Sequence, residues 1–115
     1  MKVGSVVVTP LPQADGSHKN RPALVIASVR PFGDLRVCGI STQFRRAVRD
    51  FDEIVDPAEE DYAASGLHAP SVIRLGYVST VPFSNVKGRI GSVSVTRHAR
   101  LVRRLAAYLA EAANT

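Results

Sequence analysis

Arg21 is the residue of this sequence whose type and position best suit chemistry on an anion. It stands directly before Pro22 and the apolar run 23–26. Proline favours extended geometry in the residue that precedes it, so Arg21 should lie where a loop enters a buried strand. A guanidinium is a planar, permanently charged fork of donors that matches phosphate oxygens in pairs. The alternative is a strand-end arginine that serves ion pairing, packing and solubility.

A second polar group ends another predicted strand. Residues 41–43 read Ser-Thr-Gln, and their hydroxyl and amide groups either bind a ligand or form a simple polar strand end. The segment 44–49 follows, with Phe44 beside Arg45 and Arg46. Arginines there would hold a nucleic-acid backbone, and the phenyl ring either stacks on a base or is buried in the core.

The distribution of charge indicates an anionic partner. The chain of 115 residues has a formal net charge of +5, yet residues 51–70 contain six Asp/Glu and no Lys/Arg. Both flanking regions are therefore basic. This pattern favours nucleic acid as the partner, with the acidic segment held away from it or facing elsewhere. Ordinary solvated surface charge is the alternative interpretation.

Cysteine and histidine usage argues against a disulfide or a zinc site. Cys38 is the single cysteine, and the histidines at 18, 68 and 98 show no ligand spacing. One cysteine is typical of a protein from a reducing compartment. The N-terminal run 1–8 meets Pro10 and Pro12 too soon for a signal peptide, and no stretch reaches transmembrane length. We therefore expect a cytoplasmic protein without a metal or other cofactor.

The hydrophobic pattern predicts a small, mainly β domain that spans residues 1–115. The segment 22–29 should be buried on both faces or lie at the centre of a barrel. Residues 34–39 alternate like a half-buried strand, with Leu35, Val37 and Ile40 on or near one side and Arg36 and Cys38 on the other. The remaining predicted elements are strands at 3–9 and 52–55, a strand pair or one bent strand at 71–82 with a possible bulge at Gly76, a loop at 10–20 and a turn at 85–91.

Residues 56–64 are predicted to form a helical or turn segment, and a helix is predicted near the C-terminus. Asp56, followed by Glu59 and Glu60, resembles a helix start, because acidic residues are favoured at a helix N-terminus. Residues 96–112 carry an apolar stripe at helical spacing, and Thr96 is a plausible cap. The arginines of this helix lie mostly off the stripe, as expected for a solvated face. The elements together favour an antiparallel barrel, closed or nearly so, with a C-terminal helix packed on it.

Several stretches together resemble the MazF/PemK-like toxins of bacterial toxin–antitoxin systems. They occur in the order of the family and cover nearly the whole chain. The most specific is the RPALV motif that begins at Arg21. The matching pieces are residues 4–8, 19–25, 40–43, 65–67 with 70–75, and 90–94.

The resemblance implies an SH3-like barrel, a homodimer, a cognate antitoxin and a metal-independent endoribonuclease that acts on single-stranded RNA. By this resemblance Arg21 takes the position of the catalytic arginine. The catalytic threonine position falls on Ser41, with Thr42 beside it, so either hydroxyl could act. Gly76 departs from the family pattern, since many relatives carry a more polar residue there. The general base would be His18 or solvent.

The resemblance also implies which residues contact RNA. Gln43 and Asn20 could meet base edges, and His18 belongs to the same set of expected RNA-binding residues. The phosphate-binding candidates are Lys19, Arg45, Arg46 and Arg74. Two rival interpretations stay open: a gyrase poison of the CcdB type, which shares this fold, or a degenerate toxin that only binds RNA or antitoxin. The pair of Arg21 and Ser41 favours the nuclease.

Overall fold

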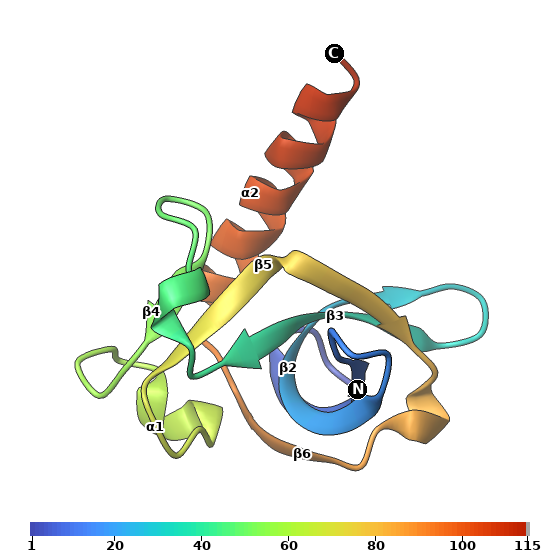
Figure 1. Cartoon of the computed structure of the whole chain (residues 1–115), viewed down its shortest axis with the longest axis horizontal. Helices are drawn as coiled ribbons and strands as arrows, with labels where there is room; N and C mark the ends of the chain where they lie inside the picture. The colour runs from blue at the N-terminus through green and yellow to red at the C-terminus, as the bar shows by residue number, and fades with distance from the viewer. Residues whose placement is uncertain (115) are drawn as a thin grey trace.

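The computed structural model describes residues 1–114 and shows six antiparallel strands curled into a half-barrel with a C-terminal helix (Figure 1). This confirms the predicted fold class. The strands follow the order β4-β5-β3-β2-β1-β6 across the sheet. Their bounds are Ser5–Pro12 (β1), His18–Val29 (β2), Asp34–Ser41 (β3), Glu53–Val55 (β4), Ser71–Val81 (β5) and Gly88–Ser92 (β6). The helices are Tyr62–Ser65 (α1) and Val95–Ala112 (α2), with 3-10 turns at Phe44–Arg46 (η1) and Phe83–Asn85 (η2).

The β1–β2 hairpin is longer than expected. Residues 10–20 were predicted as a loop, but the ladder continues until Pro12 lies opposite His18. Past Val8, β1 pairs with β2 alone in the described chain, and alternate residues of an antiparallel pair need no ladder N–H. Pro10 and Pro12 therefore fit this edge. The extension carries the hairpin past Arg21, which lies opposite Thr9.

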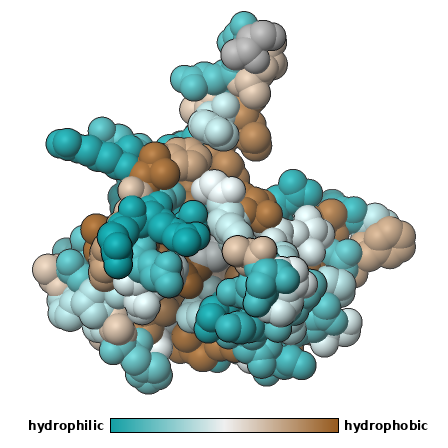
Figure 2. Space-filling model, in the orientation of Figure 1, coloured by the Kyte–Doolittle hydropathy of each residue, from teal (hydrophilic) through white to brown (hydrophobic). Residues whose placement is uncertain are grey.

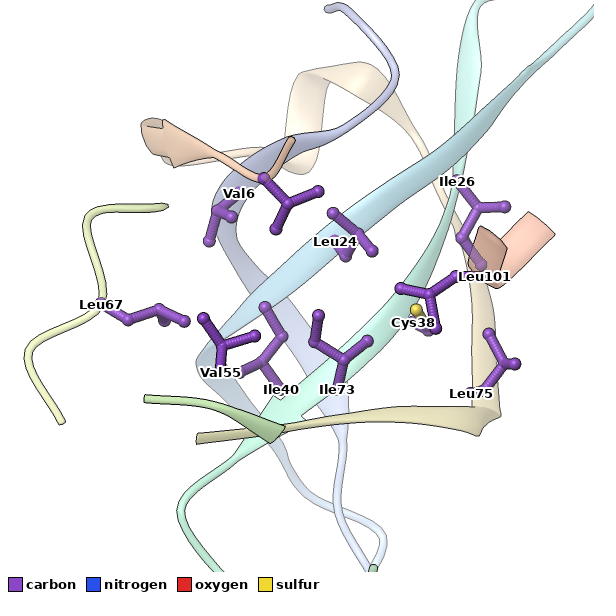
Figure 3. Close-up of a cluster of buried hydrophobic side chains, with 11 residues drawn as sticks. Val6, Leu24, Ile26, Cys38, Ile40, Val55, Leu67, Ile73, Leu75 and Leu101 are labelled. Carbon is purple, nitrogen blue, oxygen red and sulfur yellow. The ribbon is translucent and has the colours of Figure 1, made fainter. Parts of the chain in front are cut away.

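The core lies on both faces of β2 and β3. Leu24 and Ile26 belong to one apolar cluster, whereas Ala23 and Val25 belong to another on the opposite face. This confirms the prediction of two-sided burial for β2. Figure 3 shows the first cluster, where Leu101 of α2 meets side chains from the strands.

The half-buried pattern predicted for the third strand is wrong. Leu35 and Val37 share a cluster as expected, and Arg36 is exposed. Cys38 and Ile40, however, are buried in the other cluster, because α2 and β5 cover the face that was expected to meet solvent. Strand β3 is therefore an interior strand of the sheet.

Strand β5 is one bent strand. Its pairing with β3 jumps from Ile73 opposite Ile40 to Val78 opposite Cys38, so residues 74–77 leave the regular ladder. Gly76, where a possible bulge was predicted, lies in this interval. The bend is visible in Figure 1. It frees the side chains of residues 74–77 from the register of the sheet.

Helix α1 and strand β6 meet across a glycine seam. A Cβ at Gly66 would lie 2.0 Å from the Ile90 carbonyl oxygen, and one at Gly91 would lie 2.2 Å from the Ala64 carbonyl oxygen. Gly66 also has a φ of 74°, a conformation that favours glycine. One prediction fails here, because residues 88–92 pair with β1 and form a strand, not a turn. Of the two alternatives predicted for the acidic segment, Asp56 begins a turn, in which its carboxylate accepts a hydrogen bond from the Ala58 N–H.

The cap of helix α2 lies two residues earlier than expected. Ser94, rather than Thr96, caps it by accepting a hydrogen bond from the Arg97 N–H at 3.0 Å. The first half of the helix packs on the core, where Leu101 is buried. The second half projects from the sheet and leaves apolar side chains on its surface (Figure 2), with Tyr108 55% and Leu109 59% exposed. No helix of the described chain is long and apolar enough to cross a membrane.

A buried arginine joins α2 to the acidic segment. Arg97 is only 5% exposed and binds Asp61 through two hydrogen bonds of 2.8 and 3.0 Å. It also reaches Glu53 at 2.7 Å and Glu59 at 3.2 Å, and Arg100 and Arg104 pair with Glu53 as well. The solvated-face prediction is therefore wrong for Arg97. The acidic residues serve as its partners and do not form the predicted helix start.

Replacing Arg97 should destabilise the protein strongly. Arg97→Met removes the cation from a buried pair and leaves Asp61 and Glu53 without it, a change that typically costs about 3–5 kcal/mol. The free energy of unfolding in urea measures this loss. Arg103→Met is the matched control, because Arg103 is exposed and forms no ion pair with the described residues. An equal loss in both variants would contradict the role given to Arg97.

Stability should also fall at acidic pH. Hydrogen bonds from Arg97 lower the pKa of Asp61 from 3.8 to about 2. A group whose pKa is lower in the folded state stabilises the fold above its unfolded pKa and loses that effect as pH falls. The difference in thermal midpoint between the parent and Asp61→Asn should therefore be full at pH 7 and shrink between about pH 5 and pH 2. A difference that does not change with pH would contradict this assignment.

Candidate functional site

A pocket of about 840 Å³ lies where the β1–β2 hairpin, the end of β3 and the bend of β5 meet. Among the described residues that line it, the charged side chains are all arginines: Arg21, Arg46 and Arg74. No Asp or Glu of the described chain lines its wall. Cationic donors without neighbouring carboxylates are suited to bind an anion.

Most of the predicted site residues meet in this pocket. All three candidate catalytic residues line it, and so do three of the residues expected to contact RNA: Arg21, Ser41, Thr42, Gln43, Arg46 and Arg74. His18 instead lines an adjoining pocket of about 340 Å³, which shares Leu11, Pro12 and Ser79 with the first. Lys19, Asn20 and Arg45 are exposed and line neither pocket.

Arg21 is held by its backbone and not by a salt bridge. Strand β2 fixes its main chain opposite Thr9, and Pro22 follows within the same strand. The side chain is exposed, and it has no ion pair within the part of the chain that the structure describes. The alternative of an ion-paired arginine at the strand end thus finds no support. The guanidinium keeps its donors available to a ligand.

The two candidate hydroxyls differ in how firmly they are held. The Ser41 Oγ accepts a hydrogen bond from the Gln43 N–H at 3.0 Å, and Ser41 is half-buried at the end of β3. Thr42 is exposed, and no hydrogen bond to its hydroxyl is formed by the described residues. Because the bond to Ser41 occupies a lone pair, its hydroxyl proton stays free to donate.

Tyr77 is a pocket residue that the sequence did not predict. Its ring lines the pocket, its hydroxyl donates to the Pro12 carbonyl oxygen, and the Arg74 guanidinium carbon lies 5.7 Å from the ring centroid. The sequence signal was weak, since Tyr77 looks like one more apolar position after Gly76. Phe44, which could have been buried, is 42% exposed in η1 beside the site.

Other titratable groups contribute little to this pocket. Burial raises the pKa of the Cys38 thiol to about 12, so it is protonated at neutral pH and is a poor nucleophile. Asp52 points elsewhere, because its Oδ1 accepts the Leu75 N–H at 2.9 Å. Within residues 1–114 there is no group of three or more His, Cys, Asp or Glu side chains placed to hold a metal ion. The polar side chains that line the pocket are guanidinium, hydroxyl and amide groups.

Comparison with known proteins supports the resemblance. The model of the PemK-like, MazF-like toxins of type II toxin–antitoxin systems matches residues 2–109. Among solved structures, the Mycobacterium tuberculosis toxin MazF-mt6 is similar in fold, with a TM-score of 0.62 and 22% sequence identity over 88% of this chain and 91% of that chain. No curated protein sequence matches significantly. Because the family model spans nearly the whole chain and the fold agrees with it, the protein belongs to the PemK-like, MazF-like toxins of type II toxin–antitoxin systems.

Proposed function

We propose that this toxin is an endoribonuclease that cleaves single-stranded RNA in the cytoplasm without a metal ion or other cofactor. The observation that carries the proposal is the pocket in which Arg21, Arg46 and Arg74 meet the hydroxyls of Ser41 and Thr42 with no carboxylate in the described wall. Such a set of donors is complementary to a phosphodiester. The presence of Arg21 together with Ser41 also favours a nuclease over a gyrase-binding module.

The proposed reaction uses the RNA's own nucleophile. The 2′-OH attacks the adjacent phosphorus while the bond from phosphorus to the 5′ oxygen breaks, which leaves a 2′,3′-cyclic phosphate and a 5′-OH. The 2′ proton passes to a base, and the departing 5′ oxygen takes up a proton. Negative charge develops on the non-bridging oxygens during this step, and Arg21 stabilises it there as a charged donor. His18 or solvent serves as the base.

Ser41 is the better supported hydroxyl donor. Its oxygen is fixed by the Gln43 N–H at 3.0 Å, whereas the Thr42 hydroxyl has no such partner in the described structure. A donor that is already oriented costs no reorganisation when charge develops. We therefore assign the second transition-state donor to Ser41 and keep Thr42 as the comparison.

The surrounding basic residues bind the RNA. Arg46 and Arg74 line the pocket. Lys19 and Arg45 lie outside it, where a bound RNA would continue. These groups hold phosphates, while Gln43 and Asn20 present amides suited to base edges. His18 lines the adjoining pocket and completes the proposed set of RNA-binding residues.

The partner proteins follow from the family. We propose a homodimer that is neutralised by an antitoxin segment that is acidic, apolar and disordered when free. Such a segment folds on binding and can occlude an RNA groove by mimicking its charge. The arginine-lined pocket and the exposed apolar end of α2 support this assembly.

Arg21→Ala should remove cleavage and keep most RNA binding. Loss of a preorganised transition-state donor lowers the rate by roughly 10²–10³, about 3–4 kcal/mol, while several other basic residues hold the substrate. Arg21→Lys should rescue poorly, because an ammonium lacks the fork. Single-turnover cleavage of a labelled RNA in EDTA, beside RNA affinity and thermal midpoint, measures these effects.

The hydroxyl variants complete the test. Ser41→Ala should lower the cleavage rate in the same direction, whereas Thr42→Ala should change it little, because its hydroxyl is not held in place. Parent-like cleavage by Arg21→Ala would overturn the role of this residue. If the parent protein does not cleave RNA in EDTA, the metal-independent nuclease itself is wrong.

The homodimer can be tested through α2. Static light scattering at micromolar concentration should give twice the mass of one chain. Leu109 is 59% exposed in the single chain. Leu109→Glu should weaken that dimer, because it places a charge on the apolar surface of α2. Circular dichroism checks that the variant stays folded. A parent protein that is monomeric at this concentration would contradict the homodimer.

A further inference from the structure

We propose that Tyr77 is a positioning residue that fixes the Arg74 guanidinium for contact with an RNA phosphate in the pocket. This inference rests on the proposed function, and it gives one residue of that site a role that the sequence did not indicate. It follows from three contacts of the tyrosine, which involve Gly39, Pro12 and Arg74.

The first contact holds the ring against the sheet. A Cβ at Gly39 would lie 2.9 Å from the Tyr77 Cδ1, so the ring occupies the space that a side chain at position 39 would fill. Gly39 lies where the β3–β5 ladder is interrupted, between the pairs Cys38–Val78 and Ile40–Ile73. The interruption and the missing side chain together create the seat of the ring.

The second contact fixes the other end of the tyrosine. Its hydroxyl donates to the carbonyl oxygen of Pro12, the last residue of β1. Strand β1 pairs with the segment of β2 that carries Arg21. Tyr77 therefore joins β5, which provides Arg74, to the hairpin that provides Arg21, across one wall of the pocket.

The third contact places the cation. The Arg74 guanidinium carbon lies 5.7 Å from the centre of the Tyr77 ring, within the range of a cation–π interaction. An arginine has many rotamers in water, and a ring face that attracts the guanidinium reduces the entropy that must be lost when a ligand binds. Tyr77 thus orders Arg74 before RNA arrives.

The remaining donors of Arg74 point to an anion that the chain itself does not supply. Its Nε is buried and has no hydrogen-bond partner among the described residues, and no carboxylate in residues 1–114 pairs with its guanidinium. A cation–π contact leaves the N–H groups at the guanidinium edge available. A phosphate oxygen of the RNA is the acceptor that the proposed function brings into this pocket.

A double-mutant cycle tests this coupling. The variants are Arg74→Ala, Tyr77→Leu and the double variant, assayed for single-turnover cleavage of a labelled RNA and for affinity to the same RNA with a 2′-deoxy nucleotide at the cleaved position. We expect each single change to lower the cleavage rate by about tenfold. Because Tyr77 acts through Arg74, the double variant should be no slower than Arg74→Ala.

Two further variants separate positioning from general damage. Tyr77→Phe keeps the ring and should retain the cleavage rate to within about threefold, since it loses only the bond to Pro12. Phe32→Leu removes an aromatic ring from the turn between β2 and β3, where Phe32 is 85% exposed and lines neither pocket, and should leave cleavage unchanged. Thermal midpoints identify any variant that is simply unfolded.

The outcomes distinguish this inference from the proposed function. Losses that add in the double variant, or a Tyr77→Leu protein that cleaves like the parent, overturn the role of Tyr77 while the nuclease stands. If the parent binds RNA without cleaving it, the proposed nuclease activity is wrong, and the double-mutant cycle is then measured with RNA affinity. Losses of affinity that do not add support the role of Tyr77. Losses that add, or an unchanged affinity of Tyr77→Leu, overturn that role. A parent that binds no RNA overturns both.

Discussion

The interruption of the β3–β5 ladder at Gly39 is the constraint on which the pocket depends. Regular pairing would send residues 74–77 alternately to the two faces of the sheet, in register with β3. The jump between the pairs Ile40–Ile73 and Cys38–Val78 instead lets Tyr77 rest on Gly39. Ser41, only two residues after Gly39, ends β3 at the same place. One irregularity in the sheet thus brings side chains from two strands to one wall.

The electrostatics of the molecule divide into two regions with different roles. The acidic residues Glu53, Glu59 and Asp61 lie against Arg97, and Glu53 also binds further arginines of α2. These ion pairs neutralise three of the six acidic residues in segment 51–70 and hold α2 against that segment. The arginines of the pocket have no such partners in the described chain, so their charge remains available. The acidic segment therefore does not compete for the proposed RNA site.

The sequence predicted the parts of this protein whose structure depends on local pattern. The apolar run of β2 indicated two-sided burial, and the family motifs brought Arg21 and Ser41 into one proposed site. It missed β6, because residues 88–92 are mostly exposed and become a strand only by pairing with β1. Arg97 and Tyr77 were missed for the same reason: each is defined by partners distant in sequence, Asp61 for the arginine and Gly39 for the ring.

The composition of the pocket bears on how an RNA would be recognised. Guanidinium donors bind phosphates of any sequence, whereas discrimination between bases requires amide or hydroxyl contacts to their edges. Gln13 also lines the pocket, but its amide already donates to the Leu11 carbonyl at 2.9 Å, which leaves Gln43 as the better placed amide. Gly76 adds no side chain there, although a Cβ would meet only Phe51 at 3.5 Å, an ordinary contact. The glycine is therefore not imposed by lack of space. The wall of the pocket is therefore open at Gly76 and lies beside the Arg74 guanidinium, an arrangement that suits phosphate binding better than discrimination between bases.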